Sequence, residues 1–394
     1  MSNQQNKIKK IAILINTLLL GGAERIVFDI CDKIDKNEFN FHVVYMKSHK
    51  FFKNGDQSFL ELILKTGAKV TCLEGKNKSI IKEVIFLWKV LRKEKPDILH
   101  TFLPYAGVLG RIVGRLAGLN KIISTQCNLP GVYPKKMYFI DKITLFFANA
   151  WTAASIAIEE KYGGSSVFFS DEEWLRGRRH FTVLSGVDVD DIQKVIKKTD
   201  RNKKRDEFNI KEGNKVIAMT AQLTSWKGHD SLLESFVLIP KNTELLLIGD
   251  GSRRKEIERK VNDLGLSERV HFLGSRSDLF EIMAITDVYV QSYSQLLTGF
   301  VWKGPNTSQM VAAAARVPAV STNVPLIETF MKDNINGKIA LINNPKDLAE
   351  KIAYLLENRR EAERMAENAL NLVKKDFSLA AMVNSYQNIY KKLS

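Results

Sequence analysis

A chain of 394 residues, 45% of them hydrophobic, can bury more than one core and is too long for one typical domain, so we expect two domains. Its three cysteines, Cys31, Cys72 and Cys127, are too scattered for a disulfide framework or a metal-ligand cluster, which favours a reducing, cytoplasmic setting. The formal charge of +15 favours an anionic partner, such as acidic lipid or a phosphorylated ligand. Nucleic acid is a weaker candidate because the chain has no recognisable binding motif for it.

The first half of the chain alternates strand-like and helix-like segments. Short apolar runs predict strands at residues 11–15, 41–46, 70–73, 98–101 and 121–125, and periodic apolar residues predict helices at 26–34, from 80 onward, and at 107–116. This alternation is typical of a parallel α/β sheet. The most apolar segment, 143–158, is too short to span a membrane and predicts a buried helix. Residues 163–179 break the alternation and predict a surface excursion.

Residues 76–95 combine apolar side chains at helical spacing with many cations. The apolar members are Ile80, Ile81, Val84, Ile85, Leu87, Trp88 and Leu91, and the cations are Lys76, Lys78, Lys82, Lys89, Arg92, Lys93 and Lys95. Such a helix suits a membrane surface, but an ordinary domain helix with a solvated face has the same pattern. Further cations in this half of the chain favour an anionic membrane or a phosphate-linked acceptor; they are Arg111, Arg115, Lys121, Lys135, Lys136 and Lys142.

The second half repeats the strand and helix alternation after a strongly charged segment, residues 188–208. We place the domain boundary there, so that residues 1–195 form the first domain, 196–376 the second, and 377–394 a final helix. Strands are predicted at 216–220, 245–248, 270–273, 288–291, 319–322 and 339–342. Helices are predicted at 230–238, 253–264, 279–285, 308–315, 345–357, 360–374 and 379–393.

Lys227 lies in the loop of a predicted strand–helix–strand unit that ends at a Gly-Asp-Gly turn, residues 249–251. In such units ligands bind outside the carboxyl ends of the strands, and a helix amino terminus there favours an anion. Lys227, followed by Gly228, is therefore predicted to contact a phosphate.

The motifs of the chain, taken in order, resemble the retaining nucleotide-sugar glycosyltransferases of the GT-B fold, near the glycogen-synthase and bacterial mannosyltransferase group. The motifs are GGAER at 21–25, LSGVD at 184–188, KGHD at 227–230, IGDG at 248–251, VHFLG at 270–274 and DVYVQS at 287–292. The resemblance implies two Rossmann-like domains facing a cleft, with the final helix crossing back to the first domain. The first domain would hold the acceptor and the second the nucleotide diphosphate of the donor.

The resemblance also implies roles for individual residues. Lys227 would stabilise the leaving diphosphate as a catalytic residue, and no metal or other cofactor would be needed. Donor binding would involve Gly21, Gly22, Gln222, Gly251, Gly274, Ser275, Arg276, Thr298, Gly299, Phe300 and Asn306. His100, at the end of a strand facing the predicted cleft, is the second catalytic candidate, although a lone histidine is more often structural.

The chain departs from the family at several positions in this site. Gln222 occupies the position where the family has an arginine that contacts the phosphates together with the lysine. The glutamate that contacts the donor sugar maps onto Leu296 or Thr298, and the glutamate that binds the ribose maps onto Met310 or Val311.

These observations leave three interpretations. The first is a cytoplasmic glycosyltransferase, peripheral on the inner face of the membrane, that moves a sugar from a nucleotide diphosphate sugar to a glycan or lipid-linked acceptor. The second is a weakened or inactive member of the same fold that serves as a partner of an active transferase, because the departures concentrate in the cleft. The third is a nucleotide-sugar epimerase of similar architecture.

Overall fold

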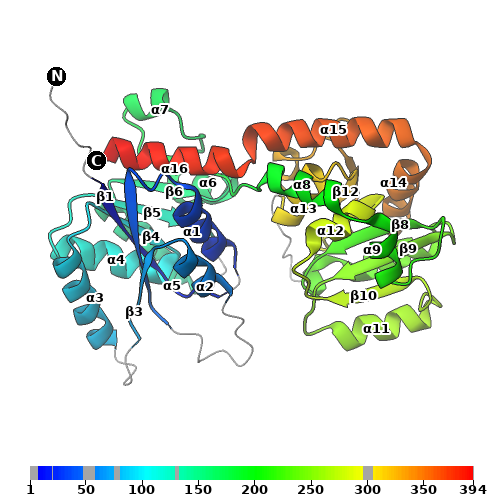
Figure 1. Cartoon of the computed structure of the whole chain (residues 1–394), viewed down its shortest axis with the longest axis horizontal. Coiled ribbons are helices and arrows are strands. Elements are labelled where there is room, and N and C mark those ends of the chain that lie inside the picture. The colour runs from blue at the N-terminus through cyan, green and yellow to red at the C-terminus, as the bar shows by residue number, and fades with distance from the viewer. Residues whose placement is uncertain are drawn as a thin grey trace. The chain divides into compact units, whose positions relative to one another are not determined.

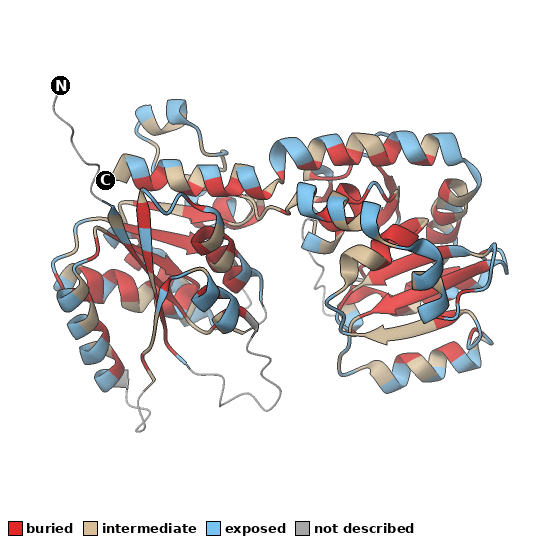
Figure 2. Cartoon of the chain, in the orientation of Figure 1, coloured by how far each residue is buried: buried red, intermediate tan, exposed pale blue. Residues whose placement is uncertain are grey.

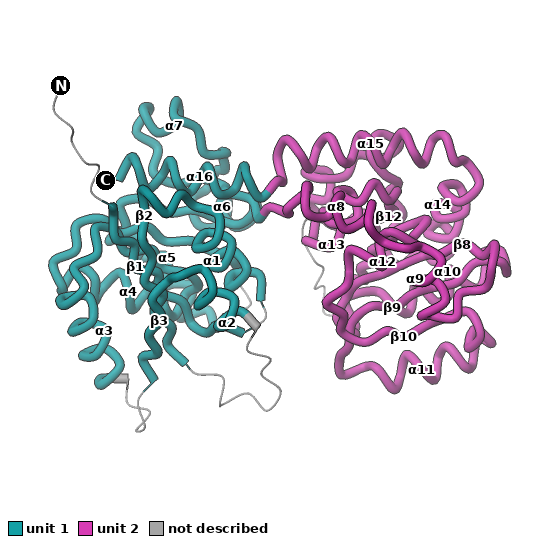
Figure 3. Tube along the Cα trace, viewed as in Figure 1, with its two compact units in different colours: residues 1–185, 379–394 teal, residues 186–378 magenta. Residues whose placement is uncertain are grey.

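The computed structural model describes residues 8–19, 21–47, 58–74, 80–128, 133–295 and 305–393. The chain forms two compact units: Met1–Ser185 with Leu379–Ser394 make unit 1, and Gly186–Ser378 make unit 2 (Figure 3). The final helix thus belongs to the unit that begins the chain, as predicted. The predicted boundary at residue 195 falls within α8 (Val189–Lys198), which packs on α12 (Leu279–Ile285) of unit 2.

Unit 1 is built on a seven-stranded parallel sheet of order β3-β2-β1-β4-β5-β6-β7 (Figure 1). Its strands are β1 (Lys9–Ile15), β2 (Phe39–Tyr45), β3 (Lys69–Cys72), β4 (Ile98–Phe102), β5 (Ile122–Gln126), β6 (Ala150–Ala153) and β7 (His180–Thr182). Its helices are α1 (Gly22–Lys33), α2 (Ser58–Lys65), α3 (Ile80–Glu94), α4 (Pro104–Leu116), α5 (Lys135–Thr144), η2 (Leu145–Phe147), α6 (Ile156–Gly163), α7 (Asp171–Leu175) and α16 (Leu379–Leu393).

Both faces of this sheet are covered, which explains why β1 is apolar from Ile11 to Ile15. Ile11 and Ile13 pack in the core beneath α1 and α16, whereas Ala12 and Leu14, which point the other way, pack beneath α3 and α4. Figure 2 shows the result, with buried residues along the strands and exposed residues on the outer sides of the helices. Within the described part of the chain, none of the helices is both long and apolar enough to cross a membrane.

The prediction of one buried helix at residues 143–158 is wrong. This segment contains the end of α5, the short helix η2, strand β6 and the start of α6. The side chain of Asn149 accepts hydrogen bonds from the Ile122 amide at 2.8 Å and from Arg115 Nη2 at 3.1 Å, and β6 then pairs with β5. Long-range strand pairing thus overrides the apolar composition, and Phe146 is left 88% exposed.

The prediction of His100 as a catalytic residue is also corrected. His100 on β4 has no exposed surface, and its ring nitrogens lie 2.7 Å from the Tyr390 hydroxyl of α16 and 2.7 Å from the Thr125 hydroxyl of β5. Burial lowers the pKa of His100 to about 3, so the imidazole is neutral. His100 therefore anchors the final helix to unit 1, and both of its ring nitrogens are already hydrogen-bonded within the protein.

Replacing Tyr390 with phenylalanine tests this structural role. We expect the free energy of unfolding to fall by about 1–3 kcal/mol, because one nitrogen of the buried His100 loses its partner. Tyr105, which is 42% exposed, provides the matched control, and Tyr105→Phe should leave stability nearly unchanged. Denaturant unfolding measures both. A Tyr390→Phe protein that is as stable as the parent would contradict this role.

Unit 2 is built on a six-stranded parallel sheet of order β10-β9-β8-β11-β12-β13. Its strands are β8 (Lys215–Thr220), β9 (Thr243–Ile248), β10 (Val270–Gly274), β11 (Val288–Gln291), β12 (Ala319–Thr322) and β13 (Lys338–Ala340). Besides α8 and α12, its helices are α9 (Arg201–Glu207), η3 (Ser225–Lys227), α10 (His229–Val237), α11 (Arg254–Asp263), α13 (Thr307–Ala314), η4 (Ile327–Thr329), α14 (Pro345–Glu357) and α15 (Arg359–Asp376).

The strand order of unit 2 creates a switch point between β8 and β11. From β8 the chain moves outward to β9 and β10, and then returns to place β11 on the other side of β8. The loops after β8 and β11 therefore diverge, which opens a crevice at the carboxyl ends of these strands.

Candidate functional site: a cavity in unit 2

A cavity of about 590 Å³ lies at the carboxyl edge of the unit 2 sheet. Thr220 and Ile248 end β8 and β9, and Ser275 follows β10. The remaining lining residues are Ala221, Gln222, Trp226, Lys227, Gly249, Asp250, Arg276, Asn306, Thr307 and Ser308. The volume lies within the range of small-molecule sites. The cavity thus lies where a ligand site was predicted, at the carboxyl ends of the strands in the strand–helix–strand unit that contains Lys227.

The Lys227 loop is held against the end of β11 by a close backbone contact at Gly228. Gly228 has a φ of +78°, and a Cβ at this position would lie 1.2 Å from the carbonyl oxygen of Ser292. The Ser292 hydroxyl donates a hydrogen bond to the Gly228 carbonyl at 2.9 Å. Only glycine allows this approach, and the approach sets where Lys227 lies.

Lys227 is largely buried in the cavity wall, with only 9% of its surface exposed. Its Nζ lies 4.2 Å from the ring centroid of Trp226 and 5.1 Å from that of Tyr293, within the range of cation–π contacts. Burial lowers the pKa of Lys227 to about 8. A bound anion would favour the ammonium form, so this lysine is suited to contact a diphosphate.

The amino terminus of α13 forms another part of the wall. Asn306 caps this helix: its Oδ1 accepts from the Gln309 amide at 2.8 Å, and the Gln309 side chain accepts from the Asn306 amide at 3.0 Å. Asn306 Nδ2 donates to Gln291 Oε1 at 2.7 Å. Thr307 and Ser308, in the first helical turn, line the cavity, where the helix dipole favours an anion.

Arg276 lines the cavity, but its charge is shared with two carboxylates. Its guanidinium bonds to Glu207 at 2.7 Å and to Asp278 at 2.7 Å and 2.5 Å. These carboxylates raise the pKa of Arg276, and the arginine in turn lowers the pKa of Asp278. The positive charge of Arg276 is therefore balanced by these two carboxylates. We expect Arg276 to attract a phosphate less strongly than Lys227 does.

The structure brings together five of the predicted donor-site residues: Gln222, Lys227, Ser275, Arg276 and Asn306 line the cavity. Two further predicted residues are sequence neighbours of the lining: Gly251 directly follows Asp250, and Gly274 ends β10 directly before Ser275.

None of the other predicted residues is among the described residues that line the cavity. Gly21 and Gly22 belong to unit 1, where they begin α1, and their role in donor binding stays a prediction. Thr298, Gly299 and Phe300 lie outside the described residues, as does Leu296. Met310 and Val311, the alternative positions for the ribose-binding glutamate, are buried apolar side chains of α13.

Sequence reasoning missed Trp226, Thr307 and Ser308 as lining residues. The signal for the last two was present, because the Asn-Thr-Ser-Gln run at 306–309 has the spacing of a capping box, which marks a helix amino terminus. Trp226 has no comparable signature, since its position depends on the turn of η3.

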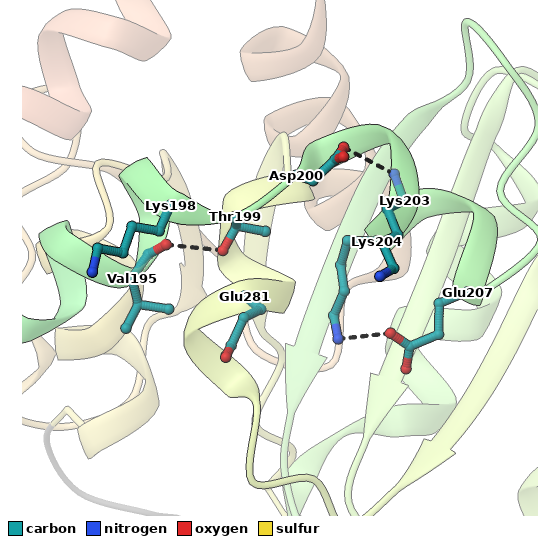
Figure 4. Close-up of a pocket in the computed structure, with 8 residues that line it drawn as sticks. All are labelled: Val195, Lys198, Thr199, Asp200, Lys203, Lys204, Glu207 and Glu281. Atoms are coloured by element: carbon teal, nitrogen blue, oxygen red, sulfur yellow. Dashed lines mark hydrogen bonds and ion pairs between the residues drawn. The ribbon is translucent and has the colours of Figure 1, made fainter.

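A second cavity, of about 420 Å³, lies between α8, α9 and α12. Figure 4 shows its lining, in which Lys204 Nζ bonds to Glu207 at 2.8 Å and the Lys203 amide bonds to Asp200 at 3.1 Å. Lys204 also pairs with Asp278. The Lys204 charge is thus paired within the protein, and none of the predicted site residues lines this cavity. The Lys227 cavity is therefore the candidate ligand site.

Two family profiles match the chain. The one described as Glycosyltransferase Family 4 matches residues 20–160, and the one described as Glycosyl transferases group 1 matches residues 200–372, which includes the whole Lys227 cavity. The chain belongs to the group 1 glycosyltransferases. This transferase therefore has the family that its motifs predicted.

Known relatives match three quarters or more of this transferase. It is 23% identical to the Escherichia coli UDP-Gal:alpha-D-GlcNAc-diphosphoundecaprenol alpha-1,3-galactosyltransferase, over 99% of this chain and 98% of that protein. It is 26% identical to the lipopolysaccharide core biosynthesis glycosyltransferase LpsE of Rhizobium meliloti, over 75% of this chain and 76% of that one.

A solved structure shares the fold. The crystal structure of Anabaena Alr3699/HepE in complex with UDP matches this transferase with a TM-score of 0.78 and 18% identity, over 97% of this chain and 100% of that one. The predicted GT-B fold, with two Rossmann-like domains, is thus confirmed.

Proposed function

We propose that this transferase moves a sugar from a nucleotide diphosphate sugar to a glycan or lipid-linked glycan, with retention of anomeric configuration. The observation that carries the proposal is the cavity at the switch point of unit 2, where Lys227 and the amino terminus of α13 both favour an anion. Uridine diphosphate is the nucleotide we favour, because the names of the Escherichia coli relative and of the Anabaena complex both contain it. The lipid-linked acceptor is proposed from the diphosphoundecaprenol in the Escherichia coli name.

The chemistry follows from the charge that develops on the leaving group. As the glycosidic bond breaks, negative charge builds on the diphosphate, and fixed donors in a water-poor cavity stabilise it. Lys227 supplies a positive charge, and Gln222 supplies an amide donor where the family has an arginine. The scheme requires no metal or cofactor, so we expect turnover to persist when a chelator is added.

Calorimetric titration with UDP, GDP and their sugars tests the donor site, and product analysis with a lipid-linked acceptor tests transfer. We expect micromolar to millimolar binding of a uridine nucleotide, in the usual range for enzyme substrates. The anomeric configuration of the product, read by NMR, tests retention. If no nucleotide or nucleotide sugar binds, the proposal fails. Fractionation of the source cells tests the cytoplasmic, membrane-peripheral location that we also propose.

The affinity for UDP should decrease as the pH rises through the lysine pKa of about 8. Above this pH Lys227 of the free protein has lost its proton. Lys227 must therefore take up a proton when the diphosphate binds, and the affinity declines by up to about tenfold per pH unit. A Lys227→Arg protein should show a flat profile over the same range, because guanidinium stays charged. Calorimetry from neutral pH upward measures both, and a flat profile in the parent would refute the assignment.

A catalytically inactive partner subunit is the second candidate function. Among the described lining residues Asp250 is the single carboxylate, and its Oδ1 accepts from the Gly251 amide at 2.7 Å to form the turn. Nucleotide binding without turnover, together with co-purification of an active transferase, would favour this candidate. Robust sugar transfer by the isolated chain excludes it.

A further inference from the structure

The helices α3, α4 and α5, with η2, lie side by side on unit 1. α4 packs against both α3 and α5, and η2 continues from α5 against α4. Their inward residues fill the core: on α3, for example, Leu87 and Leu91 are at most 1% exposed. The outer sides of these helices together form a continuous surface, which we call the α3–α5 face.

Large apolar side chains project from the α3–α5 face. Phe146 is 88% exposed, Leu116 72%, Ile81 68% and Phe139 65%. On α3 the spacing of Ile81, Ile85 and Trp88 places them on one outward stripe. In unit 2, by contrast, the exposed large apolar residues in the described part are Val237, Leu238, Ile335 and Leu341. Clustered apolar exposure of this kind marks a binding surface and is unusual on a surface that only meets water.

The charge on this face is positive and has almost no acidic counterpart. Its exposed lysines are Lys82, Lys89, Lys93, Lys135, Lys136 and Lys142. The helices α3, α4 and α5 contain three carboxylates. Glu83 and Asp141 are buried, and Glu94 pairs with Lys69 at 2.6 Å. The outward side chains are therefore apolar and cationic.

Buried polar contacts fasten α4 and α5 of this face to each other and to the sheet. Arg111 of α4 and Asp141 of α5 form a fully buried ion pair, Nη2 to Oδ1 at 2.5 Å. Tyr162 donates to the other oxygen of Asp141 at 2.7 Å, and Arg111 also donates to Ser124 of β5 at 2.6 Å. The apolar residues of α5 are thus held in place relative to the sheet, so little ordering is needed on binding.

We propose that the α3–α5 face binds the surface of an anionic lipid bilayer, with Phe139 and Phe146 among the acyl chains and the lysines at the headgroups. Apolar and basic residues interleaved on helices are the pattern of interfacial membrane binding. A protein partner fits less well, because lysine is depleted from protein–protein interfaces. The inference rests on the membrane-peripheral location proposed above and names the face that would bind the membrane. It does not depend on sugar transfer, because binding to lipid requires no nucleotide sugar.

The test is co-sedimentation of the full chain with vesicles of equimolar phosphatidylcholine and phosphatidylglycerol. We expect binding that weakens with added salt and with vesicles of phosphatidylcholine alone. Phe139→Ser/Phe146→Ser should reduce partitioning about tenfold or more, since both side chains leave the bilayer. Lys135→Gln/Lys136→Gln should weaken binding to the anionic vesicles only. Leu238→Ser/Leu341→Ser, which removes comparably exposed side chains of unit 2, is the matched control and should bind like the parent.

The outcomes separate the alternatives. The proposal is overturned if the parent does not sediment with anionic vesicles, or if the Phe139→Ser/Phe146→Ser protein binds as well as the parent. It is also overturned if that variant changes the oligomeric state in the absence of lipid, since the face would then be a protein interface. Thermal unfolding shows whether each variant is folded. We expect the Phe139→Ser/Phe146→Ser protein to fold, because both side chains are mostly exposed in the parent.

Discussion

Lys227→Ala should weaken UDP binding by about 10- to 150-fold, because losing one partner of a charged hydrogen bond costs about 1.5–3 kcal/mol. Lys227 lies in the cavity wall against Trp226 and Tyr293. Burial lowers the pKa of Lys227 to about 8, because the buried ammonium group is poorly solvated. Such a perturbed pKa is expected at a site where a bound anion stabilises the charge. Sugar transfer should fall at least as much as binding, because charge on the leaving group increases in the transition state.

Two further variants make the Lys227 result interpretable. Lys227→Met keeps the apolar stem against Trp226 and removes only the charge, so it should lose as much affinity as Lys227→Ala. Lys255→Ala removes the same charge from an exposed position on α11 and should bind UDP like the parent. Equal binding by the parent, Lys227→Ala and Lys227→Met would show that the diphosphate is held elsewhere.

Gly228→Ala is expected to destabilise unit 2 by at least about 3 kcal/mol, the largest stability effect that we predict. Its Cβ would lie 1.2 Å from the Ser292 carbonyl oxygen and 2.4 Å from the carbonyl carbon, both backbone atoms that no side-chain rotation can move away. The loop must therefore separate from the end of β11, which displaces Lys227 and should also abolish UDP binding.

The control for Gly228 is Gly213, which has nearly the same backbone conformation without the contact. Its φ is +77°, and a Cβ there would meet nothing within 4 Å. Gly213→Ala should cost only the conformational penalty of about 1–2 kcal/mol and leave UDP binding intact. Denaturant unfolding and calorimetry measure both effects. Similar losses of stability in the two variants would show that the close contact with Ser292 is not what requires glycine.

Most elements of the fold could be predicted from local sequence pattern. The strand at 216–220 and the helices at 279–285 and 345–357 were placed within a residue or so of β8, α12 and α14, because their apolar periodicity is unambiguous. The charged segment at 188–208 instead forms α8 and α9, where Val189 and Ile192 are buried on one side of a largely charged helix. Composition concealed that helix because only a narrow stripe contacts the core.

The segment around α3 shows a different limit of sequence reasoning. The sequence shows its apolar residues at helical spacing, and the structure divides them between the core and the outward face: Leu87 and Leu91 turn inward, whereas Ile85 and Trp88 remain exposed. A helix that is apolar on several sides does not reveal which side the sheet will cover. The packing of α4 beside it decides that.

By itself, the sequence determined the family, the two parallel α/β sheets and the place of Lys227, because a strand–loop–helix motif positions its own residues within a short stretch of chain. Only the tertiary structure decided which polar side chains remain available to a ligand. His100 is hydrogen-bonded to Tyr390, 290 residues away, and Arg276 is paired with Glu207, 69 residues away, so both side chains already have partners within the protein. A buried polar group takes whichever partner the fold brings within reach, and that partner is rarely a neighbour in sequence.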